Sequence, residues 1–283
     1  MHSDNIWLKR RILSYAHQGG SLEEPSSTLY AIQKAIDNGA TAIELDVHCT
    51  KDGQIVVCHD PTVDRTTEAT GEIANFTLSA LKELDNAYWF APHKAEQRDL
   101  DVNEYIYRDK AKSDNRFRIA TLDEILSEFK EMIFNFDIKR TAPEVKPYEE
   151  VLAEKLRQFN CQDRVIIASF IDSATSKFKE IAPDFSISAG TTATSEFYFA
   201  DETDPMLDDL NYVALQVPYH FNDTQVVTPS FVKKAHDHNI AVHVWTINSE
   251  NEMKELIDLG VDGIITDRPT LLTSVLANWS VGQ

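Results

Sequence analysis

Two carboxylates and a histidine share one side of a short apolar segment. In AIELDVHC (residues 42–49), the alternate positions hold Glu44, Asp46 and His48, and the residues between them are apolar. Successive side chains of a β-strand point to opposite faces, so this segment would form a strand with one ionisable and one apolar face. Two neighbouring buried carboxylates are unfavourable unless a cation or hydrogen-bond donors compensate them. The pattern therefore favours half of a metal site, with a solvated edge strand as the alternative.

Two more histidines follow neighbouring apolar segments. His17 comes directly after ILSYA (residues 12–16), and His59 comes after IVVC (residues 55–58), which a turn at residues 51–53 separates from the first strand. Both histidines would therefore stand at a strand end, close to the two carboxylates. An imidazole changes its charge near neutral pH, so it can act as a general acid or a general base. The alternative is that His59 is an incidental loop residue.

The order of the motifs resembles that of the glycerophosphodiester phosphodiesterases. In that family the opening motifs read His-Arg-Gly, Pro-Glu-Asn-Thr, Glu-Leu-Asp-Val, Thr-x-Asp-Gly, His-Asp and Asp-Arg-Thr-Thr. The corresponding segments here are HQG (17–19), PSST (25–28), ELDV (44–47), TKDG (50–53), HD (59–60) and DRTT (64–67). The departures are Gln18 in place of arginine, and Ser26 and Ser27 in place of Glu-Asn. The ordered series is much more specific than any single motif.

The resemblance implies a role for each candidate site residue. It implies that one divalent metal ion is bound by Glu44, Asp46 and Asp137. It implies that the general acid and base are His17 and His59, in an order that the sequence leaves open. It implies that the substrate is contacted by Gln18, Lys139 and Trp245, the last lining the pocket for the alcohol.

The segment NFDIK (residues 135–139) carries the third carboxylate and a lysine. Strand alternation places Asp137 and Lys139 on one face. The family element is Glu-x-Lys, so Asp137 is one methylene shorter but keeps the ligand type. Carboxylate oxygens suit Mg²⁺ or Ca²⁺ better than zinc. Three carboxylates with one divalent cation sum to a charge of about −1, so an anionic phosphate would also need Lys139. The alternative is that Lys139 is only a buried ion-pair partner.

Position 18 is where a departure from the family has a physical consequence. Gln18 offers phosphate a neutral hydrogen bond where arginine would offer a charged one, a difference of roughly 1 to 2 kcal/mol. We therefore expect Gln18→Arg to tighten phosphate binding by about tenfold.

The composition limits the partners. The 283 residues include 27 Lys and Arg against 46 Asp and Glu, a formal net charge of −19. Such a chain is a poor partner for nucleic acid or for an anionic membrane surface. The three cysteines show no CxxC spacing, which is typical of free thiols in a reducing compartment. We see no signal peptide and no transmembrane segment, and therefore expect a cytoplasmic protein.

The order of apolar segments predicts a (β/α)8 TIM barrel. From residue 121 onward, strand-like and helix-like segments alternate, and with the strands near residues 12 and 42 they give eight strands. Helical spacing also predicts helices over residues 28–38 and 77–90. Residues 91–116 lack a period and predict an insertion or lid after the second strand region, with a surface loop as the alternative. We expect one domain over residues 1–283, with its site at the C-terminal ends of the strands.

Together these features predict a metal-dependent phosphodiester hydrolase that releases sn-glycerol 3-phosphate and an alcohol from glycerophosphodiesters. One alternative is a lysophospholipase D on the same barrel, acting on lysophospholipids, which an apolar mouth at residues 91–116 would favour. Another is a non-catalytic phosphate-ester binding protein that has lost turnover through Gln18, which the intact histidine pair argues against. The head group, the choice between Mg²⁺ and Ca²⁺, the nucleophile and the oligomeric state are left open.

Overall fold

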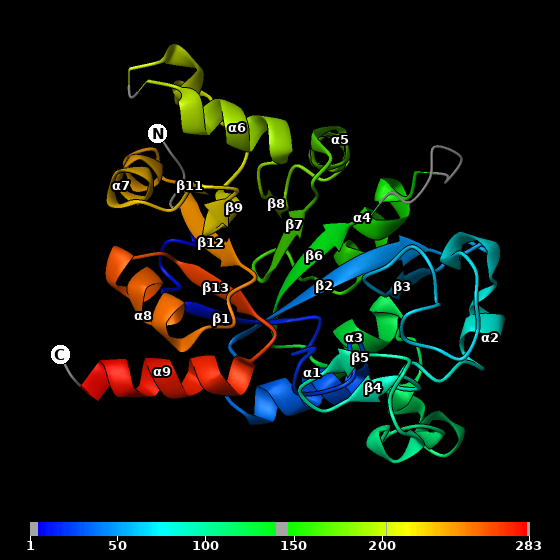
Figure 1. Ribbon diagram of the computed structural model, residues 1–283. Helices are drawn as coiled ribbons and strands as arrows, with labels where there is room; N and C mark the ends of the chain where they lie inside the picture. Colours follow the sequence, from blue (N-terminus) through cyan, green and yellow to red (C-terminus); the bar gives the residue numbers. More distant parts are fainter. Residues whose placement is uncertain (1–4, 140–146, 202, 282–283) are drawn as a thin grey trace.

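The core of the protein is a ring of eight parallel strands (Figure 1). The computed structural model describes residues 5–139, 147–201 and 203–281. In sheet order the strands are β8 (Ser186–Ile187), β7 (Val165–Ala168), β6 (Ile133–Ile138), β2 (Ala42–Cys49), β1 (Leu13–His17), β13 (Gly263–Thr266), β12 (Ala241–Trp245) and β9 (Ala214–Pro218). A parallel bridge between Ser188 and Ala214 joins the two ends of this order. The predicted (β/α)8 barrel is therefore confirmed.

Helices surround the ring (Figure 1). They are α1 (Leu29–Asp37), α2 (Leu78–Leu81), α3 (Leu122–Glu128), α4 (Glu149–Gln158), α5 (Asp172–Ile181), α6 (Thr191–Phe199), α7 (Pro229–Asp237), α8 (Glu250–Leu259) and α9 (Pro269–Val281). Side-chain caps fix several helix starts: Thr28 accepts a hydrogen bond from Ala31 N, and Thr121 and Glu124 form a capping box. Within the described ranges, no helix is both long and apolar enough to cross a membrane.

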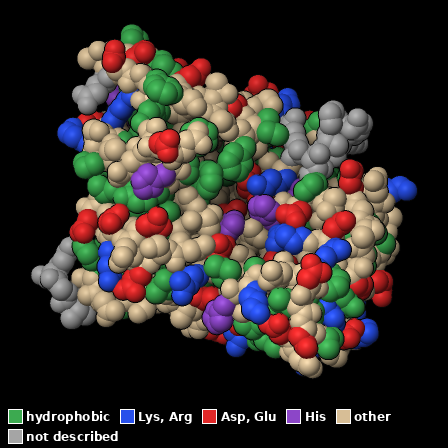
Figure 2. Space-filling view, viewed as in Figure 1, with side chains coloured by type: hydrophobic (Ala, Val, Ile, Leu, Met, Phe, Trp, Pro, Cys, Tyr) green, Lys and Arg blue, Asp and Glu red, His purple; other side chains and the backbone are tan. Residues whose placement is uncertain are grey.

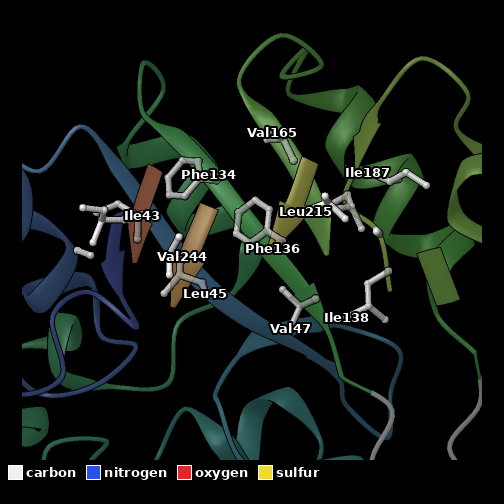
Figure 3. Packing of buried hydrophobic residues seen from close by; sticks show 14 of the residues in the cluster. Ile43, Leu45, Val47, Phe134, Phe136, Ile138, Val165, Ile187, Leu215 and Val244 are labelled. Atoms are coloured by element: carbon white, nitrogen blue, oxygen red, sulfur yellow. The ribbon is translucent and has the colours of Figure 1, made fainter. Parts of the chain in front are cut away.

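Strand alternation separates the core from the site. On β2, the side chains of Ile43, Leu45 and Val47 are fully buried in the main hydrophobic cluster, among residues of neighbouring strands and of the helices (Figure 3). Burying an aliphatic side chain of this size stabilises the fold by about 1.5–3 kcal/mol. A slip of one residue in β2 would place Glu44 and Asp46 in this layer, so the core fixes the register that positions the carboxylates.

The helix predicted over residues 77–90 is mostly absent. Only α2 is α-helical, and the chain then turns at Asp85 and Asn86. The Asp85 carboxylate accepts a hydrogen bond from Ala87 N at 3.0 Å, and the Asn86 amide donates to the Ser26 carbonyl at 3.1 Å. Such bonds from short polar side chains to the backbone compete with helix formation. The prediction of a helix as far as residue 90 is therefore wrong.

The segment 91–116 packs beside α1 without a long helix. It begins in an antiparallel hairpin of β4 (Phe90–Ala91) and β5 (Ala95–Glu96) and continues in 3₁₀ turns at Val102–Glu104, Lys110–Lys112 and Asn115–Phe117. The Tyr30 ring of α1 stacks on Phe117 with centroids 4.5 Å apart, and its hydroxyl lies 3.2 Å from that of Tyr107. These aromatic side chains face α1 and do not form an apolar mouth.

Several smaller elements complete the described structure. Strand β3 (Ile55–Val57) pairs with β2 in the antiparallel direction. Strands β10 (His220–Phe221) and β11 (Thr224–Gln225) form a hairpin. Single 3₁₀ turns lie at Ile73–Asn75 and Pro205–Asp208.

Candidate active site

The predicted site residues meet at the C-terminal ends of the barrel strands. His17 is the last residue of β1, Trp245 is the last residue of β12, and Lys139 directly follows β6. His59 lies just beyond β3, which runs antiparallel to β2. In the space-filling view, histidine side chains lie with basic and acidic ones around a hollow near the centre of this face (Figure 2). The convergence follows from the barrel, because all its parallel strands end on the same side.

Lys139 lies between two aspartates. Its Nζ is 3.1 Å from Asp46 Oδ1 and 2.8 Å from Asp137 Oδ2. The two aspartates face each other across β2 and β6, where they are paired in register. The remaining oxygens, Asp46 Oδ2 and Asp137 Oδ1, are buried and have no hydrogen-bond partner among the described residues. A buried carboxylate oxygen without a donor is costly, so this pair still lacks a cation or a donor.

The buried charges in this cluster shift one another's pKa values. Burial, reinforced by the neighbouring Asp46, raises the pKa of Glu44. Burial also raises the pKa of Asp137, although Lys139 opposes the effect. Burial alone would lower the pKa of Lys139, but Asp46 and Asp137 outweigh it and raise that pKa. Lys139 is therefore charged at neutral pH, and the three carboxylates around it favour additional positive charge.

His17 is held by a carboxylate from the last barrel strand. Its Nδ1 lies 2.6 Å from Oδ1 of Asp267, which follows β13, and its Nε2 lies 3.7 Å from Glu44 Oε2. Burial by itself would lower the pKa of His17. The hydrogen bond to Asp267, with the charges of Glu44, Asp267 and Asp46, outweighs burial and raises this pKa to about 9. Asp267 thus stabilises the imidazolium form and fixes the direction in which Nε2 points.

His59 has a matching arrangement. Its Nδ1 lies 2.7 Å from Asp60 Oδ1, and the ring is partly exposed. Burial would raise the pKa of Asp60, but hydrogen bonds and charge from His59 and Arg65 lower it to about 2. The rings of His17 and His59 face each other edge to face, with centroids 6.1 Å apart. Each histidine is therefore oriented by an aspartate at Nδ1, which turns its Nε2 away from that carboxylate.

Gln18 lies next to His17 in a buried position. Its backbone is in the left-handed region with φ 52°, and its N–H donates to the Glu44 carbonyl at 2.9 Å. The side-chain oxygen Oε1 accepts from Ser26 Oγ at 2.5 Å and from Arg65 Nη2 at 3.3 Å. The amide nitrogen lies 3.2 Å from His17 Nε2. Gln18 therefore turns its amide oxygen toward Ser26 and Arg65 and its amide nitrogen toward His17.

An apolar cavity of about 440 Å³ adjoins the carboxylates. Asp137 lines it, and so do residues that follow β7, residues of α6 and the hairpin of β10 and β11. Its wall includes Phe170 and Trp245, whose ring centroids are 5.5 Å apart. The lining residues Phe170, Phe199 and Phe221 are 55%, 80% and 66% exposed. Trp245 thus lines a cavity whose lining is rich in exposed aromatic side chains.

Comparisons with known proteins identify the family. The sequence model of the Glycerophosphoryl diester phosphodiesterase family matches residues 17–271. The chain belongs to the glycerophosphodiester phosphodiesterase family. A glycerophosphodiester phosphodiesterase of Caldanaerobacter subterraneus is 32% identical over 94% of this chain and 98% of its own length. A Bacillus subtilis glycerophosphodiester phosphodiesterase is 30% identical, over 96% and 88% respectively.

Solved structures of the same family share the fold. The glycerophosphodiester phosphodiesterase of Agrobacterium tumefaciens has a TM-score of 0.69 at 21% identity and covers 92% of this chain and 98% of its own. A phosphodiesterase from Oleispira antarctica, solved with the product sn-glycerol-3-phosphate, has a TM-score of 0.67 at 24% identity and covers 93% and 97%. The chain is accordingly a phosphoric diester hydrolase of the glycerophosphodiester phosphodiesterase class.

Glycerophosphodiester phosphodiesterases generally depend on a divalent cation. The oxygen donors that the sequence predicts for such an ion are Glu44, Asp46 and Asp137, and the partnerless buried oxygens of the two aspartates fit this chemistry. Within residues 5–139, 147–201 and 203–281, however, no three carboxylate, imidazole or thiol groups converge on one point. In this arrangement the Lys139 ammonium lies between the aspartates. The chemistry of the donors fits a divalent cation, and Lys139 supplies the positive charge here.

His48, the third ionisable residue on this face of β2, is covered by the fold. Its side chain is buried and its Nε2 lies 3.4 Å from the His59 carbonyl oxygen. Burial lowers the pKa of His48 to about 4, so the ring is neutral. The reason is that β3 pairs with β2 here, opposite Val56, and covers this end of the strand.

Sequence reasoning missed the residues that orient the histidines. Asp267 directly follows the strand GIIT, and the rule that barrel sites form at strand ends could have found it. Asp60 and Arg65 stood inside recognised motifs without an assigned role. Glu96 lies in a segment without periodicity, and no sequence signal indicated that its carboxylate approaches the site.

Proposed function

We propose that this family member hydrolyses glycerophosphodiesters to sn-glycerol 3-phosphate and an alcohol, with His17 and His59 as general acid and base. The observation that supports this most strongly is the facing pair of imidazoles, each held at Nδ1 by an aspartate. One ring would take the proton of the nucleophile, and the other would protonate the departing alcohol oxygen. Each ring is an imidazolium either before or after its step, and the aspartates stabilise that form.

The remaining charged groups would neutralise the phosphate. Lys139 would exchange part of its contact with the aspartates for a phosphate oxygen, and the Gln18 amide would donate a hydrogen bond to another. Mg²⁺ or Ca²⁺ held by Glu44, Asp46 and Asp137 would supply further positive charge at the non-bridging oxygens.

The experiment is a product assay on the purified protein. Glycerophosphocholine and a chromogenic phosphodiester are supplied with Mg²⁺ or Ca²⁺, and sn-glycerol 3-phosphate is quantified enzymatically. We expect release of sn-glycerol 3-phosphate by the wild type and loss of release in the double variant His17→Ala/His59→Ala. Binding of sn-glycerol 3-phosphate without turnover of either diester would contradict the proposal and favour the non-catalytic binding protein.

The apolar cavity favours a second candidate, a lysophospholipase D on the same barrel. The alkyl or acyl part of a lysophospholipid needs apolar surface next to the phosphate, and the cavity offers it from Asp137 outward. Its lining includes the exposed side chains of Phe170, Phe199 and Phe221. The apolar mouth therefore lies at α6 and the hairpin of β10 and β11, not at residues 91–116.

A matched pair of substitutions separates the two candidates. Phe221→Ser should raise KM for lysophosphatidylcholine by about tenfold or more, because burial of one aromatic ring is worth about 1.5–3 kcal/mol. KM for glycerophosphocholine should not change. Val102→Ser is the control, since Val102 is 62% exposed but lies in the segment 91–116, outside the cavity lining. Equal effects of Phe221→Ser on both substrates, or no hydrolysis of lysophosphatidylcholine by the wild type, would reject the second candidate.

A further inference from the structure

The three positions that depart from the family pattern belong to one cluster. Ser26 Oγ donates to Gln18 Oε1 at 2.5 Å and lies 3.5 Å from Ser27 Oγ. All three side chains are buried. A second donor to Gln18 Oε1 is the Arg65 guanidinium, at 3.3 Å. The chain therefore contains a guanidinium beside position 18, although position 18 itself is neutral.

Arg65 connects this cluster to the second histidine. Its Nε donates to Asp60 Oδ2 at 2.8 Å, and the other oxygen of Asp60 holds His59 Nδ1 at 2.7 Å. A guanidinium has five donors in a rigid plane, so one side chain can serve Asp60 and Gln18 together. Because guanidinium groups cannot accept hydrogen bonds, the Gln18 amide must turn its oxygen to Arg65 and its nitrogen toward His17.

Glu96 fixes Arg65 from the opposite side. Its Oε2 accepts from Arg65 Nη1 at 2.5 Å, and its Oε1 accepts from the backbone N–H of Ser26 at 3.1 Å. The Glu96 side chain is 0% exposed, so this ion pair is shielded from water on the glutamate side. Glu96 belongs to β5, in the hairpin that opens the segment 91–116. The segment therefore contributes a buried charge to the supporting structure of the site.

We propose that Glu96 and Arg65 are positioning residues of the hydrolytic reaction: Glu96 anchors the guanidinium that holds Asp60 and thereby orients His59. The same guanidinium fixes the amide of Gln18. The inference rests on the proposed role of His59, and it assigns to residues 91–116 a part in catalysis that needs no closing motion. The Ser26 hydroxyl and the Arg65 guanidinium both donate to Gln18 Oε1, so the side chain of Ser26 helps to hold the same amide.

The kinetic test uses Glu96→Gln, with Glu104→Gln as the control from the same segment, where Glu104 pairs with the exposed Lys94. Loss of one charge-assisted bond should lower kcat by about tenfold in Glu96→Gln and should leave Glu104→Gln at the wild-type rate. In a background that carries both His59→Ala and Gln18→Ala, Glu96→Gln should change kcat by less than about twofold, because both groups that the ion pair positions are gone. A full tenfold loss in that background would show a merely structural role and would overturn the proposal.

A second variant and a second readout keep the test independent of folding and of turnover. Arg65→Lys keeps a cation beside Glu96 but replaces the planar guanidinium by a single ammonium nitrogen. We therefore expect the same loss of kcat as in Glu96→Gln. A wild-type kcat in Arg65→Lys would overturn the proposal. The NMR shift of the His59 Cε1 proton should move in Glu96→Gln and Arg65→Lys but not in Glu104→Gln. An unmoved signal in both variants would also overturn it. Failure of the proposed function would appear separately, as absence of turnover by the wild type.

Discussion

Asp267 is the group that we expect to control the charge of His17. The Asp267→Asn substitution keeps the shape of the side chain and removes its negative charge. One charge-assisted hydrogen bond is worth about 1.5–3 kcal/mol, and one pKa unit corresponds to about 1.4 kcal/mol. The substitution should therefore lower the pKa of His17 by about 1 to 2 units, from about 9 toward 7 or 8. Glu44 and Asp46 still favour the imidazolium, so the pKa should remain above its ordinary value.

The pH dependence of folding gives the direction of the stability effect. Because the pKa of His17 is higher in the folded protein, its interaction with Asp267 stabilises the fold fully below about pH 6.5. This contribution is lost as the pH rises through the folded value of about 9. The wild type should therefore lose about 2 kcal/mol of its stability advantage over Asp267→Asn, measured as the difference in free energy of unfolding, between pH 6 and pH 10.

The assay combines urea unfolding with NMR titration of the His17 Cε1 proton. Both are run on metal-free protein in chelator, since a bound cation would change the charges near His17. Ser21→Ala is the control, because Ser21 Oγ donates to the same Asp267 oxygen at 2.6 Å without contributing a charge. The kcat of Asp267→Asn should also fall by about 10²-fold, since His17 would lose its orientation. An unchanged pKa of His17 in Asp267→Asn would refute this reasoning.

Three further predictions concern the rest of the site. His17→Ala and His59→Ala should each lower kcat/KM by about 10²-fold or more. The wild-type pH profile of kcat/KM should be bell-shaped. If either variant keeps the wild-type rate at every pH, that histidine takes no part in the mechanism. Chelation should abolish activity, and Asp46→Asn should weaken binding of Mg²⁺ or Ca²⁺ in calorimetry; full turnover by protein with verified zero metal content would contradict the metal assignment. Gln18→Arg should weaken inhibition by inorganic phosphate, because the new guanidinium would face Arg65, which lies 3.3 Å from Gln18 Oε1. This direction is contrary to the tenfold gain in phosphate binding expected from the sequence alone. Tighter inhibition by phosphate would contradict the prediction.

Local sequence patterns predict much of the barrel and many of the chemical groups at its strand ends. The alternation in residues 42–49 predicts both the buried face of β2 and the carboxylates opposite it, and both are present. The alternation of β and α segments predicts the barrel, and the barrel brings residues from strand ends together. These features need only a period of two or of 3.6 residues, which neighbouring residues determine by themselves.

The partners of the site residues depend on how the barrel closes. Asp267 is 250 residues from His17 in the chain and reaches it because β13 pairs with β1. Glu96 meets Arg65 only because the segment 91–116 packs against the loop between β1 and α1. The apolar cavity forms where α6 and the hairpin of β10 and β11 approach Trp245. Sequence alone therefore determined which groups could do chemistry at the strand ends. Tertiary structure decided which carboxylate contacts each histidine and where apolar surface adjoins Asp137. The reason is that contacts between distant segments are set by packing and not by local periodicity.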